Sequence, residues 1–306
     1  MKVLTGKELA IKHKAEKIVL TASRRTDMPA FYTNELLKGL KEGKFHPQTM
    51  MQPMWELSFE PSDIHSVGLW SQDFRKWIEK RHDISDLGYK FWYRFTILPD
   101  DPVCKPKAPS VEEQLKQLGT LANTDGSPCI FVFIDPLIQY KHIGETNWKY
   151  NFSDASIDVI VRKTHQLGIK SITVSLLDYY KHVEKRALRK GFEFRFLNPN
   201  NRSDQEEMIE TVQRIRNITD AYQVDLKTCC EPYLHSNGFT RQGSCVDGNY
   251  LNKVFGPGAS VRPDAGQRKT FGCGCTLAVD IGRYTEHGEW SHHCRHECPQ
   301  CYARKK

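Results

Sequence analysis

The amino-acid sequence predicts an α/β fold, a partial (β/α)6 TIM-like barrel with a cysteine-rich C-terminal tail that closes the barrel mouth. Short runs rich in β-branched and aromatic residues alternate about six times with longer amphipathic stretches, which is the pattern of repeated β-α units around a parallel sheet. The last fifty or so residues lose this periodicity and carry cysteines instead. We therefore expect metal or cluster ligation, rather than a hydrophobic core, to hold the tail.

The predicted strands are short β-branched and aromatic runs, and they are Lys17–Ser23, His65–Trp70, Lys90–Leu98, Cys129–Asp135, Ser171–Asp178 and Gln223–Cys229. The predicted helices follow these strands and have a helical apolar period, and they are Ala30–Glu42, Gln72–Lys80, Val111–Leu121, Asp154–Leu167, Lys181–Lys190 and Asp204–Tyr222. Segment Thr49–Phe59 is predicted as an extra strand or hairpin, and Pro99–Pro109 as a surface loop because it holds four prolines.

The predicted domain organisation has three parts. Residues 1–16 form an N-terminal extension, residues 17–256 the barrel domain and residues 257–306 the cysteine-rich tail. A short helix is predicted at Gly248–Phe255, and the sequence Gly256-Pro257-Gly258 marks the break before the tail.

Composition excludes several classes of protein. The chain has 306 residues, of which 39% are hydrophobic and 26% charged, so a folded body is expected. Its apolar runs are too short to span a bilayer, and residues 1–17 contain no signal-peptide core, which predicts a cytoplasmic protein. The net charge of +7 suits anionic partners without the density of a nucleic-acid-coating arm.

The strongest chemical signal is the spacing of the last three cysteines. Cys294, Cys298 and Cys301 form a CxxxCxxC motif. Three thiolates spaced in this way can each bind one iron of a [4Fe–4S] cluster, which leaves the fourth iron without a protein ligand. In radical S-adenosylmethionine (SAM) enzymes the open iron binds SAM, and an electron from the cluster cleaves SAM to a 5′-deoxyadenosyl radical that abstracts hydrogen from a substrate.

The sequence resembles the uncharacterised DUF1848 family over nearly its whole length, in the segments Thr21–Tyr32, Thr228–Glu231, Cys273–Tyr284 and the closing cysteine triad. This resemblance implies a C-terminal cysteine cluster similar to that of radical SAM enzymes, with no reaction assigned. In typical radical SAM enzymes the cluster loop follows the first strand, whereas here it follows the barrel, so a permuted arrangement is implied. The usual aromatic position before the third cysteine is Gln300 here, and the aromatic residue is Tyr302. We take Tyr302 as the candidate SAM contact.

A second interpretation of CxxxCxxC is a structural zinc site with His292, His293 or His296 as the fourth ligand. The sequence also offers a further thiol set. Four more cysteines form a candidate auxiliary [4Fe–4S] cluster or tetrahedral zinc site, and they are Cys229, Cys245, Cys273 and Cys275. The alternative is that these four are ordinary thiols, and we treat Cys104, Cys129 and Cys230 as non-ligands.

Polar residues after the predicted strands are candidate cofactor contacts, because the carboxyl ends of barrel strands form the active site. Arg25 offers bidentate binding of a carboxylate or phosphate, and Asp27 can orient a neighbouring arginine. Glu231, after the last strand, is a candidate polar contact for SAM or substrate. Arg94 is functional only if it faces the interior, which the pattern leaves open.

These observations together predict a radical SAM enzyme with an unknown substrate and no assigned catalytic residue. Its cofactors are a [4Fe–4S] cluster and SAM, with a second cluster or zinc as a candidate, and it needs an electron donor such as a flavodoxin or ferredoxin. The alternative is a zinc-stapled binding module for nucleic acid or another acidic partner.

Overall fold

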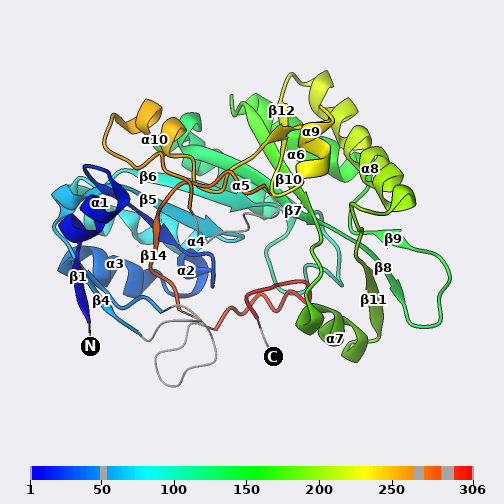
Figure 1. Cartoon of the computed structure of the whole chain (residues 1–306), viewed down its shortest axis with the longest axis horizontal. Coiled ribbons are helices and arrows are strands. Elements are labelled where there is room, and N and C mark those ends of the chain that lie inside the picture. The colour runs from blue at the N-terminus through cyan, green and yellow to red at the C-terminus, as the bar shows by residue number, and fades with distance from the viewer. Residues whose placement is uncertain (1, 49–53, 265–271, 284–292, 305–306) are drawn as a thin grey trace.

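The central element of the computed structural model is a sheet of eight strands, in which every neighbouring pair is parallel (Figure 1). The structure describes residues 2–48, 54–264, 272–283 and 293–304. In sheet order the strands are β13 (Arg241–Gln242), β12 (Asp225–Thr228), β10 (Ser171–Leu176), β7 (Ile130–Leu137), β6 (Phe91–Thr96), β5 (Ile64–Ser71), β2 (Ile18–Ala22) and β14 (Val279–Asp280). The six inner strands are those that the sequence predicts.

The sheet differs from the prediction at its edges. Both edge strands, β13 and β14, come from the chain after residue 231, and each is two residues long. They lie at opposite ends of the strand order, so the sheet is open among the residues that the structure describes. What the structure shows is therefore a mixed α/β fold with a large parallel sheet and no closed barrel.

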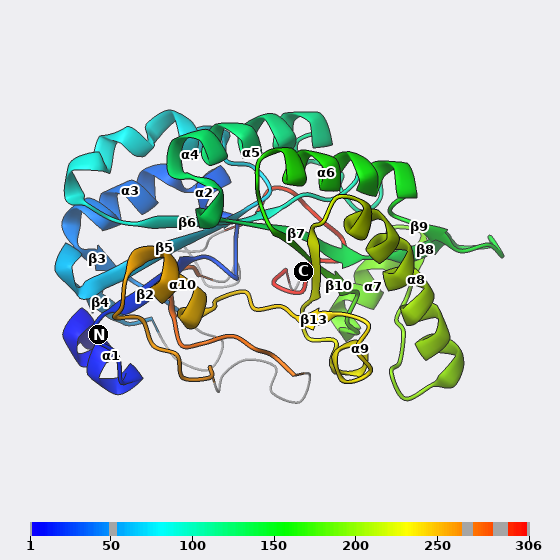
Figure 2. The same ribbon diagram turned by 90° about the horizontal axis from the view of Figure 1, so that it is seen from above.

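The helices cover one face of this sheet, as Figure 2 shows for α3, α4, α5 and α6. The helices between β2 and β12 are α2 (Met28–Phe31), α3 (Thr33–Glu42), α4 (Arg75–Lys80), α5 (Val111–Asp125), α6 (Asp154–Gln166), α7 (Lys181–Arg189) and α8 (Arg202–Ala221). Of these, α7 packs on a small separate sheet instead of the main one. Helices α5 and α6 begin at the capping serines Ser110 and Ser153, whose side chains accept from backbone N–H groups of the first turn. The predicted helix boundaries agree with these to within a few residues.

The other face of the sheet is covered by the chain after β12. Helix α9 (Pro232–Ser236) is followed by β13, α10 (Gly248–Phe255) and β14. Val246 and Leu251 pack against Trp70 and Trp92 of the sheet, and α10 lies opposite the layer of α3 to α6 (Figure 2). Both faces of the inner strands are therefore buried, which explains why they are nearly continuous apolar runs.

Two small sheets flank the main one. The first has the order β1 (Val3–Thr5), β4 (Glu56–Ser58) and β3 (Lys44–Phe45), and the second β11 (Phe192–Arg195), β8 (Gln139–His142) and β9 (Lys149–Tyr150). Helix α1 (Gly6–His13) packs beside β2, so the segment predicted as an extension contributes Leu9 and Ala10 to the core. Part of the predicted Thr49–Phe59 element, residues 49–53, lies outside the described residues, and the rest contains β4. No helix in the described ranges is long and apolar enough to cross a membrane.

Candidate functional site

The direction of the side chains along β6 decides which residues lie on the face of the sheet opposite helices α3 to α6. Nε1 of Trp77 in α4 donates to the hydroxyl of Tyr93 at 3.3 Å, and the rings of Phe74 and Phe95 meet with centroids 4.8 Å apart. These contacts place Tyr93 and Phe95 on the face that the helices cover. Because successive side chains of a strand alternate, Arg94 faces the interior.

Two guanidinium groups lie over one indole ring at the carboxyl ends of the strands. Arg94 lies 4.6 Å from the ring centroid of Trp70 and pairs with Asp135 of β7. Arg24, after β2, lies 5.1 Å from the same ring and donates to Asp264 at 3.4 Å. Nη2 of Arg24 and Nε of Arg94 are buried without a hydrogen-bond partner in the part of the chain that the structure describes. The two side chains therefore present donors suited to a carboxylate or phosphate.

A buried carboxyl lies at the carboxyl end of β12. The backbone N–H of Leu176 donates to Oε1 of Glu231 at 2.9 Å. Burial, with a smaller contribution from the neighbouring charge of Asp135, raises the pKa of Glu231 to about 8. Asp135 also accepts a hydrogen bond from the hydroxyl of Ser175. Glu231 is thus a carboxyl group that binds and releases a proton near neutral pH.

The CxxxCxxC segment lies across the carboxyl ends of the strands, between α2 and α7 (Figure 1). Three loops and helix α7 hold it. The loop contacts are His296 Nε2 with Asp27 Oδ2 (2.8 Å), Gln72 Nε2 to Cys298 Sγ (3.5 Å) and Gln300 Nε2 to the Cys104 carbonyl (2.8 Å). From α7, Arg186 Nη1 donates to the carbonyls of Pro299 (2.7 Å) and Cys301 (3.0 Å). Burial, followed by the charge of Cys301, raises the pKa of Cys298 to about 12. Burial, Asp27 and Cys301 raise the pKa of Cys294 as well. The three thiols are therefore electrostatic neighbours.

Asp27 is the main anchor of this segment. Its carboxylate accepts from the backbone N–H of Ala30 at 3.0 Å, the hydroxyl of Ser71 at 2.6 Å and the backbone N–H of Gln72 at 2.9 Å, in addition to His296. The same residue is the N-cap of α2. Nδ1 of His296, in contrast, is buried and has no partner among the described residues.

A second group of thiols lies at the end of β12. Sγ of Cys229 lies 3.8 Å from Sγ of Cys230 and 3.7 Å from Sγ of Cys245. The thiol of Cys273 interacts with those of Cys230 and Cys275, and the thiol of Cys275 with that of Cys245, so that their pKa values are linked. We call these five cysteines, which lie near one another at the end of β12, the five-cysteine ring.

Both cysteine groups consist of free thiols. Within the described ranges, no three His, Cys, Asp or Glu side chains already converge on one point at metal-binding distance. The chemistry of each donor set fits a thiophilic metal, since thiols that lie side by side ligate after losing their protons.

The other residues that the sequence singles out have defined positions, and their roles as cofactor contacts stay predictions. Nη1 of Arg25 donates to the carbonyls of Asp280 and Gly282, at 3.2 and 2.7 Å, so Arg25 holds the edge strand β14. Tyr302 donates to the Arg24 carbonyl at 3.0 Å and stacks on Tyr180 with ring centroids 5.9 Å apart. The candidate zinc ligand His292 lies outside the described residues.

Sequence reasoning did not select two residues that the structure brings to the site. Arg24 contacts the same indole as Arg94, although only Arg25 was singled out. Cys230 was treated as a non-ligand but lies inside the five-cysteine ring. The signal that could have found it is the Cys229-Cys230 pair at a strand end, where the chain has to turn.

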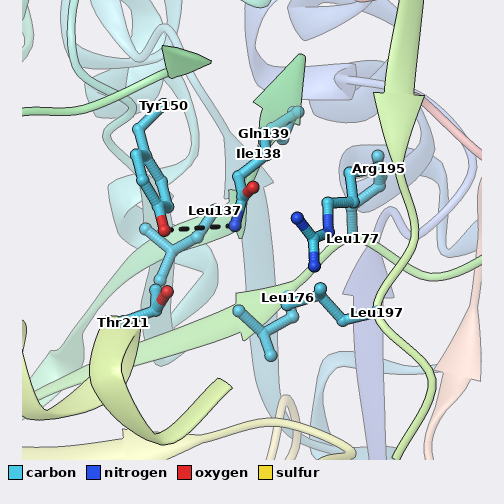
Figure 3. Close-up of a pocket in the computed structure, with 9 residues that line it drawn as sticks. All are labelled: Leu137, Ile138, Gln139, Tyr150, Leu176, Leu177, Arg195, Leu197 and Thr211. Carbon is cyan, nitrogen blue, oxygen red and sulfur yellow. Dashed lines mark hydrogen bonds between the residues drawn. The ribbon is translucent and has the colours of Figure 1, made fainter. Parts of the chain in front are cut away.

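A separate pocket lies between the ends of β7 and β10 and the small sheet of β8, β9 and β11 (Figure 3). Its lining is largely apolar and includes Leu137, Leu176, Leu197 and Arg195. No cysteine lines it, so it does not belong to either thiol group.

Comparisons with known proteins place the sequence in a family. No curated protein matches it significantly. Among solved structures, the crystal structure of SuiB from Streptococcus suis, bound to its precursor peptide SuiA, matches with a TM-score of 0.32 and 9% sequence identity, over 81% of this chain and 48% of that one. The chain therefore spans about half the length of SuiB. A family model described as a domain of unknown function, DUF1848, matches residues 19–303, and the chain belongs to the DUF1848 family.

Proposed function

We propose that this protein is a radical SAM-type enzyme in which Cys294, Cys298 and Cys301 hold a [4Fe–4S] cluster with one open iron. The observation that carries the proposal is the position of the CxxxCxxC segment. It lies across the strand ends, and it is held by the side chains of Asp27, Gln72 and Arg186 and by the backbone carbonyl of Cys104. Arg24, Arg94 and Glu231 lie at the same strand ends, where they could contact a ligand of the cluster.

When bound, the cluster would supply the electron that cleaves SAM into methionine and a 5′-deoxyadenosyl radical. An electron donor such as a flavodoxin or ferredoxin would deliver that electron. The chain's own part is to bind, orient and exclude water. The unpaired donors of Arg24 and Arg94 suit the carboxylate of SAM or an anionic group of the substrate. Glu231, with its pKa near 8, can hold or release a proton beside the bound substrate.

The residues around the cluster loop act as positioning groups in this proposal. Asp27 fixes the loop through His296, and the N–H of Gln72 that reaches Cys298 Sγ is suited to stabilise a charged thiolate. Tyr302 and Tyr180 supply aromatic surface at the edge of the site for stacking of the adenine.

Electron paramagnetic resonance tests the proposal. Anaerobically prepared, dithionite-reduced protein is expected to give a [4Fe–4S] signal that changes when SAM is added. Cys298→Ala should abolish the signal, whereas Cys129→Ala, which removes a buried cysteine remote from both thiol groups, should leave it intact. A cluster signal that does not respond to SAM, or zinc in place of iron under anaerobic conditions, would sink the proposal.

A second candidate function is supported by His296. Its Nε2 is held by Asp27 and its buried Nδ1 has no partner among the described residues. A carboxylate that holds one ring nitrogen while the other is free is the usual arrangement of a metal-binding histidine. Nδ1 and the three thiols would then close a Cys3His zinc site, and the chain would be a zinc-stapled module for an acidic partner. Colourless, zinc-loaded protein that loses its zinc in His296→Ala would favour this candidate.

A further inference from the structure

The five-cysteine ring is built from three separate stretches of chain. Cys229 and Cys230 follow β12, Cys245 follows β13, and Cys273 and Cys275 precede β14. The second and third stretches are joined by hydrogen bonds, since Ser244 Oγ donates to the carbonyl of Gly274 at 2.9 Å and the Thr276 N–H donates to the carbonyl of Val246 at 3.0 Å. The thiols are therefore presented by a frame that is already ordered.

Two local features of the backbone aim the thiols at one another. Cys230 has a φ of +60°, which is uncommon for a residue with a side chain. In a continuing strand Cys229 and Cys230 would point to opposite faces, and the left-handed turn is what brings their sulfurs to 3.8 Å. At Gly274, a Cβ would lie 2.7 Å from Ser244 Oγ, so a larger residue would have to displace that hydroxyl from the Gly274 carbonyl it contacts.

The sulfur spacing distinguishes between the two metal centres that a thiol set can hold. A tetrahedral zinc ion with Zn–S bonds of about 2.3 Å has S···S edges of about 3.8 Å. Sγ of Cys229 lies 3.8 Å from Sγ of Cys230 and 3.7 Å from Sγ of Cys245. A cubane places four irons and four sulfides between its thiolates, which forces them much farther apart.

The charges around the ring fit an anionic metal centre. Four thiolates around a divalent cation carry a net charge of −2. The guanidinium groups of Arg24 and Arg94 act electrostatically on Cys275 and Cys245 respectively, and the backbone N–H of Cys245 donates to Sγ of Cys275 at 3.2 Å. Nearby positive charge and a backbone N–H donor both stabilise a metal-bound thiolate.

From this spacing, frame and charge we propose that four thiols of the five-cysteine ring hold a single tetrahedral zinc ion, independently of the CxxxCxxC segment. The zinc ties the loop after β13 and the loop before β14 to the end of β12. It thus fixes the two edge strands of the open sheet and the layer that covers its interior. Because a metal site of this kind contributes its binding energy to folding, bound zinc would stabilise the region after β12 further.

The alternative to a metal site is a disulfide between two cysteines of the five-cysteine ring. Cys229 and Cys245 lie close enough for their thiols to be oxidised to a disulfide, with the two electrons and two protons passing to an external oxidant. A zinc-bound ring resists such oxidation, so the number of free thiols under non-denaturing conditions separates the two states.

Metal analysis of two matched double variants tests the proposal. Five thiols leave a spare, so a single substitution still leaves four ligands, whereas Cys245→Ser/Cys275→Ser leaves three. We expect this variant to lose about one zinc ion per chain relative to the wild type. The control, Cys129→Ser/Cys298→Ser, removes one buried cysteine and one cysteine of the triad, and it should keep the ring's zinc.

Cobalt substitution keeps the test decisive if the double variant does not fold. Wild-type protein grown with Co²⁺ in place of Zn²⁺ should show the visible bands and strong sulfur-to-cobalt charge transfer of a four-thiolate tetrahedral site. Unchanged zinc in the Cys245→Ser/Cys275→Ser variant, loss of iron instead of zinc, or two missing thiols without bound metal would each overturn the proposal. Failure of the radical SAM proposal would be seen separately, because that proposal concerns iron bound by the CxxxCxxC segment, which Cys298→Ser removes, and not the zinc of the five-cysteine ring.

Discussion

Asp27 offers the sharpest test of how the cysteine tail is held, because one buried carboxylate joins three parts of the chain. In Asp27→Ala, α2 loses its N-cap, which costs about 1 kcal/mol. The N–H groups of Gln72 and His296 lose their acceptor, at about 1 to 2 kcal/mol each. Ser71 keeps the carbonyl of Asp73 at 2.9 Å and adds little. The free energy of unfolding should therefore fall by about 3 to 5 kcal/mol.

Urea denaturation of wild type, Asp27→Ala, His296→Ala and the double variant measures this loss. Together the four proteins form a double-mutant cycle that isolates the contact between Asp27 and His296 of the tail. The cycle should give a coupling energy of about 1 to 2 kcal/mol between Asp27 and His296. Asp27→Asn is the matched control for side-chain volume and should fall between the wild type and the alanine variant. A loss below about 1 kcal/mol in Asp27→Ala, or a coupling energy near zero, would refute the assignment of Asp27 as the anchor.

Three further outcomes follow from the packing and the electrostatics. Gly68→Ala should destabilise the protein by at least about 1 to 3 kcal/mol, because the new Cβ would lie 2.2 Å from the ring of Trp92. Gly119→Ala in α5, where nothing lies within 4 Å of the new Cβ, should instead stabilise the protein by up to about 1 kcal/mol. Thermal melts measure both effects, and equal shifts of the melting temperature in the two variants would contradict this prediction. Burial lowers the pKa of His65 below its ordinary value of about 6.5, so the unfolded state takes up the proton more readily and stability is lost as pH falls through and below 6.5. In urea titrations between pH 8 and pH 5, the stability of wild type relative to His65→Asn should fall with pH, and a constant difference would show that His65 is not the group responsible.

The six inner strands could be predicted from the sequence because parallel strands buried on both faces are short continuous apolar runs. All eight residues of β5 are buried, for example. The edge strands could not be predicted, since Arg241–Gln242 and Val279–Asp280 are two residues long and depend on pairing with β12 and β2. The small sheet of β8, β9 and β11 was also missed, because its strands have only two to four residues and pair with one another rather than with the main sheet.

The candidate site was predictable in its residue types but not in its geometry. The last three cysteines are visible as a motif, yet their position over the strand ends depends on distant partners such as Asp27 and Arg186. Alternation along β6 left two orientations of Arg94 open, and the contact between Trp77 and Tyr93 decides between them. Cys230 was treated as a non-ligand, and the positive φ that turns it towards Cys229 cannot be read from the sequence.

Reductive cleavage of SAM tests the central claim most directly. Cluster-loaded protein, reduced with dithionite and supplied with SAM, is analysed for 5′-deoxyadenosine by chromatography and mass spectrometry. The account predicts that wild type and Cys129→Ala both form 5′-deoxyadenosine and that Cys298→Ala forms none. Wild-type protein with a full complement of iron that forms no 5′-deoxyadenosine, or a Cys298→Ala variant that forms as much as the wild type, would contradict it.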